Sequence, residues 1–135
     1  MFINLVNTFL GMVILKGKVE SGICNFSYWM EKLELFYTKK CGMKLFPGTL
    51  NVKLDTEWRL PKKRIRLEKE EYSGTVSVNI VPCKIFSRKA FILRTDKAED
   101  GLADHDRTVI EVATDVKLRD EYDLEDGDMV EVEVD

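Results

Sequence analysis

The sequence predicts a mainly β fold: a compact β-barrel that carries one substantial α-helix. Many short apolar segments are bounded by turn residues, and only one segment has helical spacing. Neither a repeat nor a low-complexity linker interrupts the 135 residues. Hydrophobic residues make up 44% of the chain and charged residues 33%, which is ordinary for a globular protein with its own core.

The chain starts with an apolar, uncharged stretch, Met1–Leu15. This stretch lacks the positively charged start and the cleavage site of a signal peptide, and it is too short to span a membrane. A strand pattern begins directly after Met12. We therefore treat residues 1–11 as either an N-terminal extension or a misassigned start, and residues 12–135 as a single barrel domain.

Helical spacing is found in Tyr28–Lys40, where apolar side chains recur on one face between charged residues. Gly42 follows as a helix stop, and Lys39 and Lys40 suit the negative end of the helix dipole. The loop before this helix is Gly22–Ser27. We expect the apolar face of the helix to pack on the core through Trp29, Leu33, Phe36 and Tyr37.

The strands are predicted from apolar and β-branched runs between turn residues. Val76, Val78 and Ile80 alternate with polar residues, as in a half-buried strand. Near the end, Glu121–Asp128 supplies a short helix or turn and then a tight Asp-Gly corner. The predicted strands are Val13–Val19, Thr49–Leu54, Ile65–Leu67, Val76–Pro82, Lys84–Phe86, Ala90–Arg94, Val109–Ala113 and Met129–Val134.

Composition argues against several functions. A formal charge of −3 disfavours a broad nucleic-acid binder, and the basic run Pro61–Arg64 is typical of a solvated loop. The three cysteines (Cys24, Cys41 and Cys83) have no metal-ligand spacing and form no disulfide framework, so a reducing, cytoplasmic setting fits best. The single histidine, His105, excludes histidine-rich zinc sites.

Asp96–Arg107 is a long polar connector, typical either of a binding loop or of a solvated surface loop. Within it His105 lies between Asp104 and Asp106, which favours its charged form. The imidazolium could pair with a phosphate or simply with these neighbouring carboxylates. Both interpretations of the segment stay open.

The segment Leu45–Leu54 contains the most informative chemistry. A Pro47-Gly48 turn leads into a strand on which Thr49 and Asn51 point the same way, because alternate strand residues share a face. Their two neutral oxygens suit a hard cation that is shared with a nucleotide phosphate. The alternative is a hairpin corner in which both side chains bond their own backbone.

Taken together, these segments resemble the archaeal CTP-dependent riboflavin kinase family from about Lys16 to Val134. The resemblance rests on motifs that occur in order along the chain, and it implies a six-stranded cradle-loop (RIFT-like) β-barrel with one substantial helix. The matching motifs are Gly17–Gly22, Pro47–Asn51, Val81–Ile85, Ile110–Val112, Val116–Arg119 and Leu124–Asp128.

The resemblance also implies roles for individual residues. Thr49 and Asn51 match the pair that holds magnesium, and Glu111 matches a flavin-binding glutamate. Ala103 falls at a flavin contact where the family tends to carry a hydroxyl, which alanine lacks. No catalytic base stands out. The nucleotide-binding residues implied are Gly22, Ile23, Cys24, Asn25, Phe26 and Ser27 around the phosphates, and Val116, Lys117, Leu118 and Arg119 along the nucleotide.

The function implied is magnesium-assisted transfer of the CTP γ-phosphate to the 5′-hydroxyl of riboflavin, giving FMN and CDP. Phosphoryl transfer depends mainly on positioning of the substrates and neutralisation of the phosphate charge. However, Cys24 and Phe26 stand where the family has glycines that let backbone amides approach phosphate. The alternative is therefore a non-catalytic or substrate-shifted barrel that binds a nucleotide or flavin. We expect no nucleic-acid or membrane partner.

Because the strand pattern starts at Val13, we expect residues 1–11 to contribute little to the core. A chain that begins at Met12 should therefore unfold at nearly the same temperature as the full chain, as measured by circular dichroism. A loss of several degrees would show that the first residues pack against the barrel.

Overall fold

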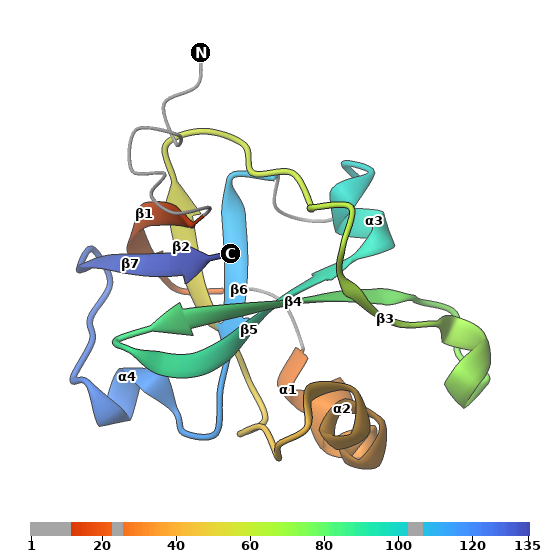
Figure 1. Ribbon diagram of the computed structural model, residues 1–135. Helices are drawn as coiled ribbons and strands as arrows, with labels where there is room; N and C mark the ends of the chain where they lie inside the picture. Colours follow the sequence, from red (N-terminus) through yellow and green to blue (C-terminus); the bar gives the residue numbers. More distant parts are fainter. Residues whose placement is uncertain (1–11, 23–25, 103–106) are drawn as a thin grey trace.

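The structure, a computed structural model, describes residues 12–22, 26–102 and 107–135 (Figure 1). The predicted extension, residues 1–11, lies outside the described residues, so the division at Met12 stays a prediction. In chain order the elements are β1 (Val13–Glu20), α1 (Phe26–Lys32), α2 (Glu34–Cys41), β2 (Leu50–Leu54), β3 (Ile65–Leu67), the 3₁₀ helix η2 (Lys69–Tyr72), β4 (Val78–Ile85), β5 (Arg88–Thr95), α3 (Asp96–Glu99), β6 (Val109–Ala113), α4 (Leu118–Glu121) and β7 (Met129–Val134).

The strands close into a barrel. The sheet order is β3-β4-β5-β6-β2-β1-β7, all described pairs are antiparallel, and β7 returns to pair with β4. Six strands therefore form the ring in the described part of the chain, and β3 lies outside it beside β4. In Figure 1, β2 and β6 run up the view while β4, β5 and β7 cross it. The predicted six-stranded barrel is confirmed.

β4 is one continuous strand, whereas the sequence predicts two strands that break at Cys83, directly after Pro82. The prediction is wrong because Pro82 lies where β4 changes neighbours. β3 pairs with β4 as far as Ile80, and β7 pairs with it from Cys83 onward. On the other side, β5 pairs with the whole strand, Pro82 included. A proline that cannot donate a hydrogen bond is tolerated at such a point.

The core has two parts. Side chains on the inner face of the strands fill the barrel, among them Leu15, Val52, Ile92 and Val112, all of which are fully buried. A second cluster lies on the outer face, where α1 and α2 cover β3, β4 and β5 (Figure 1). The outer cluster comprises Phe26, Met30, Tyr37, Cys41, Leu45, Leu67, Val78, Ile80, Phe91, Leu93 and Ala113.

The single helix predicted over Tyr28–Lys40 is instead two short helices. The chain leaves helical geometry at Leu33, whose φ and ψ are −107° and 28°. The stop at Gly42 is as expected: its φ is +73°, and its N–H donates to the Thr38 carbonyl. Trp29 is 41% exposed, so the buried face is carried by Phe26, Met30 and Tyr37 rather than by Trp29.

The predicted polar loop after β5 begins as the short helix α3, capped by the Thr95 hydroxyl, which accepts from the Ala98 N–H at 3.0 Å. Arg94, only 3% exposed, holds this segment. Its guanidinium pairs with Glu99 at 3.0 Å and donates to the carbonyls of Trp58, Arg107 and Val109. Within the described residues, no helix is long and apolar enough to cross a membrane.

Arg94→Met should lower the free energy of unfolding by about 3 kcal/mol, because it leaves Glu99 and three carbonyls without their buried cation. Arg59 is a matched control: it contacts the same Glu99 at 3.1 Å, but its side chain is 63% exposed. Arg59→Met should change stability by at most about 0.5 kcal/mol. Urea denaturation measures both, and equal effects would contradict the structural role assigned to Arg94.

Candidate functional site

The site starts from the register of β2, which pairs with β1 on one side and with β6 on the other. Asn51 stands opposite Glu20 on β1 and opposite Glu111 on β6. Directly opposed residues of antiparallel strands share a face. Leu50 and Val52 point into the barrel, so this polar row lies on the outer face.

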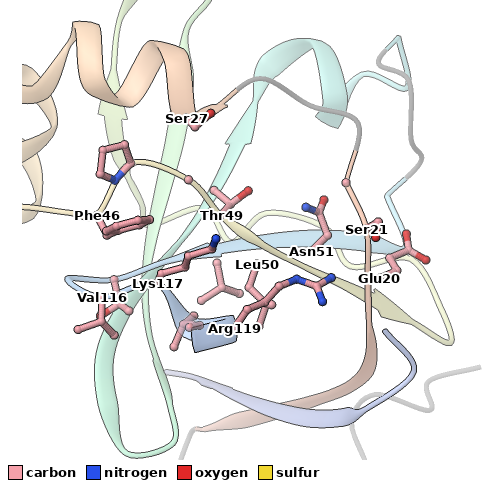
Figure 2. A pocket seen from close by; sticks show the side chains of 16 residues that line it. Glu20, Ser21, Ser27, Phe46, Thr49, Leu50, Asn51, Val116, Lys117 and Arg119 are labelled. Atoms are coloured by element: carbon pink, nitrogen blue, oxygen red, sulfur yellow. The ribbon is translucent and has the colours of Figure 1, made fainter. Parts of the chain in front are cut away.

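A pocket of about 550 Å³ opens beside this row (Figure 2). Its volume lies within the range of about 300–1,000 Å³ that is common for small-molecule sites. The pocket combines side chains of the two predicted segments, one around Thr49 and the other around Arg119, although they are far apart in the chain. It is lined by Glu20, Ser21, Gly22, Ser27, Phe46, Pro47, Gly48, Thr49, Leu50, Asn51, Val112, Thr114, Val116, Lys117, Leu118 and Arg119.

One wall is the Pro47-Gly48 corner that leads into β2. Gly48 has a φ of +132°, a backbone conformation that favours glycine. Its N–H contacts the Met30 sulfur at 3.3 Å, and the Phe46 N–H donates to the Thr114 carbonyl at 2.8 Å. The corner is therefore fixed to α1 and to the segment after β6, and it holds Thr49 at the mouth of the strand.

Thr49 and Asn51 both line the pocket, and neither behaves as a simple turn residue. The Thr49 hydroxyl donates to Glu111 Oε1 at 2.7 Å, which leaves the oxygen lone pairs for another partner. Asn51 is 8% exposed, and its Oδ1 has no hydrogen-bond partner among the described residues. A buried oxygen in this condition is costly unless it serves a ligand.

This pair of oxygens fits a magnesium ion. Magnesium prefers oxygen ligands, keeps several of its waters and usually shares phosphate oxygens with a substrate. The described residues contain no group of three or more His, Cys, Asp and Glu side chains placed to hold a metal. A cation at Thr49 and Asn51 would therefore depend on phosphate and water for its remaining ligands.

Gly22 approaches Asn51 too closely for any side chain. A Cβ built on Gly22 would lie 2.1 Å from Asn51 Nδ2 and 2.6 Å from its Cγ. The missing side chain lets the backbone after β1 cover the Asn51 amide. The glycine that opens the predicted loop Gly22–Ser27 therefore has a packing reason that the sequence alone does not reveal.

The other predicted residues divide into three groups. Gly22, Ser27, Val116, Lys117, Leu118 and Arg119 line the pocket together with Thr49 and Asn51. Phe26 does not, because its side chain is 8% exposed within the core cluster beneath α1, so any role for it in binding rests on its backbone. Glu111 does not line it either: this residue is 4% exposed and accepts the hydrogen bond of the Thr49 hydroxyl. Four predicted residues lie outside the described ranges, as do Asp104 and His105 of the polar connector: Ile23, Cys24, Asn25 and Ala103.

Arg119 reaches into the pocket from α4 (Figure 2). From the sequence, Arg119 could bind a phosphate or pair with Asp120 or Glu121; the structure instead places its Nη2 2.5 Å from Asp126 Oδ1. The second oxygen of Asp126 accepts from the Ser21 hydroxyl at 2.8 Å. Hydrogen bonds from Arg119 and then Ser21 hold the pKa of Asp126 below its usual value. At the rim of the pocket, Lys117 Nζ lies 4.0 Å from Asp120 Oδ2, and the lysine side chain is 54% exposed.

The sequence does not predict Glu20, Ser21 and Thr114 as pocket residues, or Asp126 as the partner of Ser21 and Arg119. Glu20 could have been found by alternation from Val19, which faces the barrel, once β1 was paired with β2. Ser21 and Asp126 are separated by more than a hundred residues, so their contact follows only from the closed barrel.

The fold and the pocket define a class of protein: a small antiparallel β-barrel with a small-molecule pocket beside the start of β2, lined by polar and apolar side chains. Residues 19–134 match the sequence model of the family CTP-dep_RFKase, whose description reads "Domain of unknown function DUF120". The match covers most of the chain, and the chain belongs to this family.

Several curated proteins are similar to the chain, each named riboflavin kinase. One from Archaeoglobus fulgidus is 33% identical over 132 residues, which cover 92% of this chain and 55% of that protein. One from Pyrobaculum arsenaticum is 34% identical over 140 residues, covering 93% and 62%. One from Staphylothermus marinus is 24% identical over 120 residues, covering 87% and 88%. The chain therefore spans between 55% and 62% of the length of the first two relatives.

The close approach of Gly22 to Asn51 gives a stability test. Gly22→Ala should lower the free energy of unfolding by about 1–3 kcal/mol, because the added methyl group must displace a buried amide. In an Asn51→Ala background, Gly22→Ala should cost much less, since the amide is no longer there. Urea denaturation of the four proteins measures this coupling, and additive effects would show that the two residues do not meet.

Proposed function

We propose that this protein is a riboflavin kinase that uses CTP and magnesium. Family membership and the riboflavin kinases among its relatives support the reaction class. The preference for CTP is supported only by the family name and by the resemblance of Val116–Arg119 to a nucleotide-binding segment. The outcome would be FMN and CDP.

One observation carries the proposal: the hydrogen bond between Thr49 and Glu111, at 2.7 Å. Thr49 belongs to the predicted metal and phosphate site, and Glu111 is the predicted flavin ligand. The bond joins two sites that the sequence predicts separately. A flavin bound at Glu111 would therefore place its hydroxyl beside the phosphate end of the pocket, as transfer between two substrates requires.

The pocket is suited to a nucleotide. Arg119 and Lys117 bring two positive charges to one rim, and a guanidinium binds phosphate oxygens in a fork-like geometry. Ser27 adds a hydroxyl group at the pocket wall. Phe46, which is 40% exposed and lines the same pocket, offers an aromatic face on which a base could stack.

Thr49 Oγ1 and Asn51 Oδ1 are the atoms that would hold the magnesium ion. When bound, this ion neutralises the charge of the terminal phosphates and fixes their geometry. The residues of the chain do the remaining work. Glu111 orients the Thr49 hydroxyl, Gly22 covers Asn51, and Arg119 compensates the charge that moves to the leaving diphosphate.

In the reaction, the 5′-oxygen of riboflavin forms a bond to the γ-phosphorus, and the bond from that phosphorus to the β–γ bridging oxygen breaks. The bridging oxygen leaves on CDP, and the hydroxyl proton is released. A loose transition state of this type needs alignment and charge neutralisation more than a strong base. We therefore assign no catalytic base.

The same proposal places the protein in the cytoplasm, because free cysteines fit a reducing compartment. Cys41 and Cys83 are free and buried, and burial raises the pKa of each thiol to about 12, so neither is a reactive thiolate.

The direct test is riboflavin phosphorylation by the protein with magnesium and each of CTP, ATP, GTP and UTP, with FMN measured by chromatography. We expect FMN formation with CTP above the other nucleotides. Flavin or nucleotide binding without turnover from any of the four would instead favour the non-catalytic module.

The variant Asn51→Leu should lose activity without losing stability. It keeps the branched shape of the side chain and removes a buried oxygen that has no partner among the described residues, so unfolding should occur at the same or a higher temperature. We expect kcat/KM to fall by about a hundredfold or more, because magnesium is lost from the phosphates.

Thr49→Val, which removes the hydroxyl oxygen, should weaken magnesium-dependent nucleotide binding by more than it lowers stability, and so should Asn51→Leu. Thr49→Ser, which keeps the hydroxyl, is the matched control and should retain most activity. If Asn51→Leu and Thr49→Val bind magnesium–CTP like the parent in calorimetry, the pair is only a turn feature.

A further inference from the structure

Asp126 lies outside the pocket yet contacts two side chains that line it. Its Oδ1 is 2.5 Å from Arg119 Nη2, and its Oδ2 accepts from Ser21 Oγ at 2.8 Å. Arg119 reaches the pocket from α4 and Ser21 from the end of β1. One carboxylate therefore links the two arms that flank the pocket on this side.

The position of Asp126 is fixed by the backbone of its own turn. The Gly127 N–H donates to the Val19 carbonyl at 2.7 Å, and the Val19 N–H donates to the Asp128 carbonyl at 2.8 Å. On the other side of the turn, the Leu124 N–H donates to the Arg119 carbonyl at 2.9 Å. The turn is thus hydrogen-bonded to both β1 and α4, and the Asp126 carboxylate lies between Ser21 and Arg119.

We propose that Asp126 is a positioning residue that holds the Arg119 guanidinium toward the phosphates of a nucleotide in this pocket. The inference rests on the proposed function, because it needs a phosphate ligand. A guanidinium carries five N–H donors, and the contact with Asp126 uses one Nη2 donor, which leaves the rest of the fork for phosphate. Figure 2 shows the Arg119 side chain directed toward Ser21 and Asn51.

Two effects of Asp126 on a phosphate oppose each other. Its negative charge repels the ligand, whereas fixing a long, flexible arginine before binding removes an entropic cost. Asp126 does not line the pocket and its side chain is 56% exposed, so solvent and salt screen the repulsion. The 2.5 Å contact that orients Arg119 is direct. The orienting effect therefore dominates.

The exposure of the Arg119–Asp126 ion pair also allows a positioning role to be distinguished from a role in stability. The side chains of Arg119 and Asp126 are 32% and 56% exposed, and exposed ion pairs contribute little to folding. Removing the Asp126 carboxylate should therefore change nucleotide binding far more than it changes the unfolding temperature. If Asp126 had only a structural role, its removal would lower the unfolding temperature more than it weakens nucleotide binding.

The experiment is isothermal titration calorimetry of magnesium–CTP, and of cytidine as a probe without phosphates. The proteins compared are the parent, Asp126→Ala, Arg119→Met and the double variant. Glu125→Ala is the matched control, because it removes another exposed carboxylate from the same turn. We expect Asp126→Ala to raise the Kd for magnesium–CTP about tenfold, as loss of a side chain that orients a ligand-binding group often does. Binding of cytidine should stay unchanged, and Glu125→Ala should bind both probes like the parent.

The double-variant cycle decides the mechanism. If Asp126 acts through Arg119, Asp126→Ala should have almost no further effect once Arg119 is methionine. An equal loss in both backgrounds, an unchanged Kd in Asp126→Ala, or tighter binding would each overturn the inference. Should Asp126→Ala unfold at a much lower temperature, Asp126→Asn keeps the shape and provides the same comparison. Absence of magnesium–CTP binding by the parent would overturn the proposed function, and this inference with it.

Discussion

The pocket depends on the register of β2 between its two neighbours. Asn51 faces outward because Leu50 and Val52 fill the barrel, and it stands between Glu20 and Glu111 because β1 and β6 pair with β2 in this register. A slip by one residue would turn Asn51 into the barrel and expose the leucine and valine, since side chains alternate between the two faces. Burial of the barrel interior therefore fixes the polar row on the outer face.

The strands were predictable because their signals are local. Alternation and turn residues locate every described strand of the barrel, although β4 is read as two strands. Its continuity through Pro82 depends on a change of neighbour that is set by β3 and β7, and no local pattern records that change. The helical segment stops at Gly42 as predicted, but it begins at Phe26, inside the predicted loop Gly22–Ser27. The break at Leu33 belongs to packing over the outer core cluster.

The site was predictable only in part, for the same physical reason. Alternation along one strand brings Thr49 and Asn51 together, and the resemblance adds Val116–Arg119 to their surroundings. Both sets line one pocket. The bond from Thr49 to Glu111 and the bridge from Ser21 to Asp126 join residues that are distant in the chain. Such contacts follow from strand pairing and barrel closure, which one sequence does not specify.

The position of Phe26 bears on the main departure from the family. An aromatic residue in a phosphate loop argues against binding if its ring competes with the ligand. Here the ring is buried with Met30 and Tyr37 in the outer core cluster, while the next residue, Ser27, lines the pocket. The side chain and the adjoining backbone therefore face different surroundings. A glycine at this position would remove buried apolar area without opening the pocket, so the aromatic residue is compatible with phosphate binding by its neighbours.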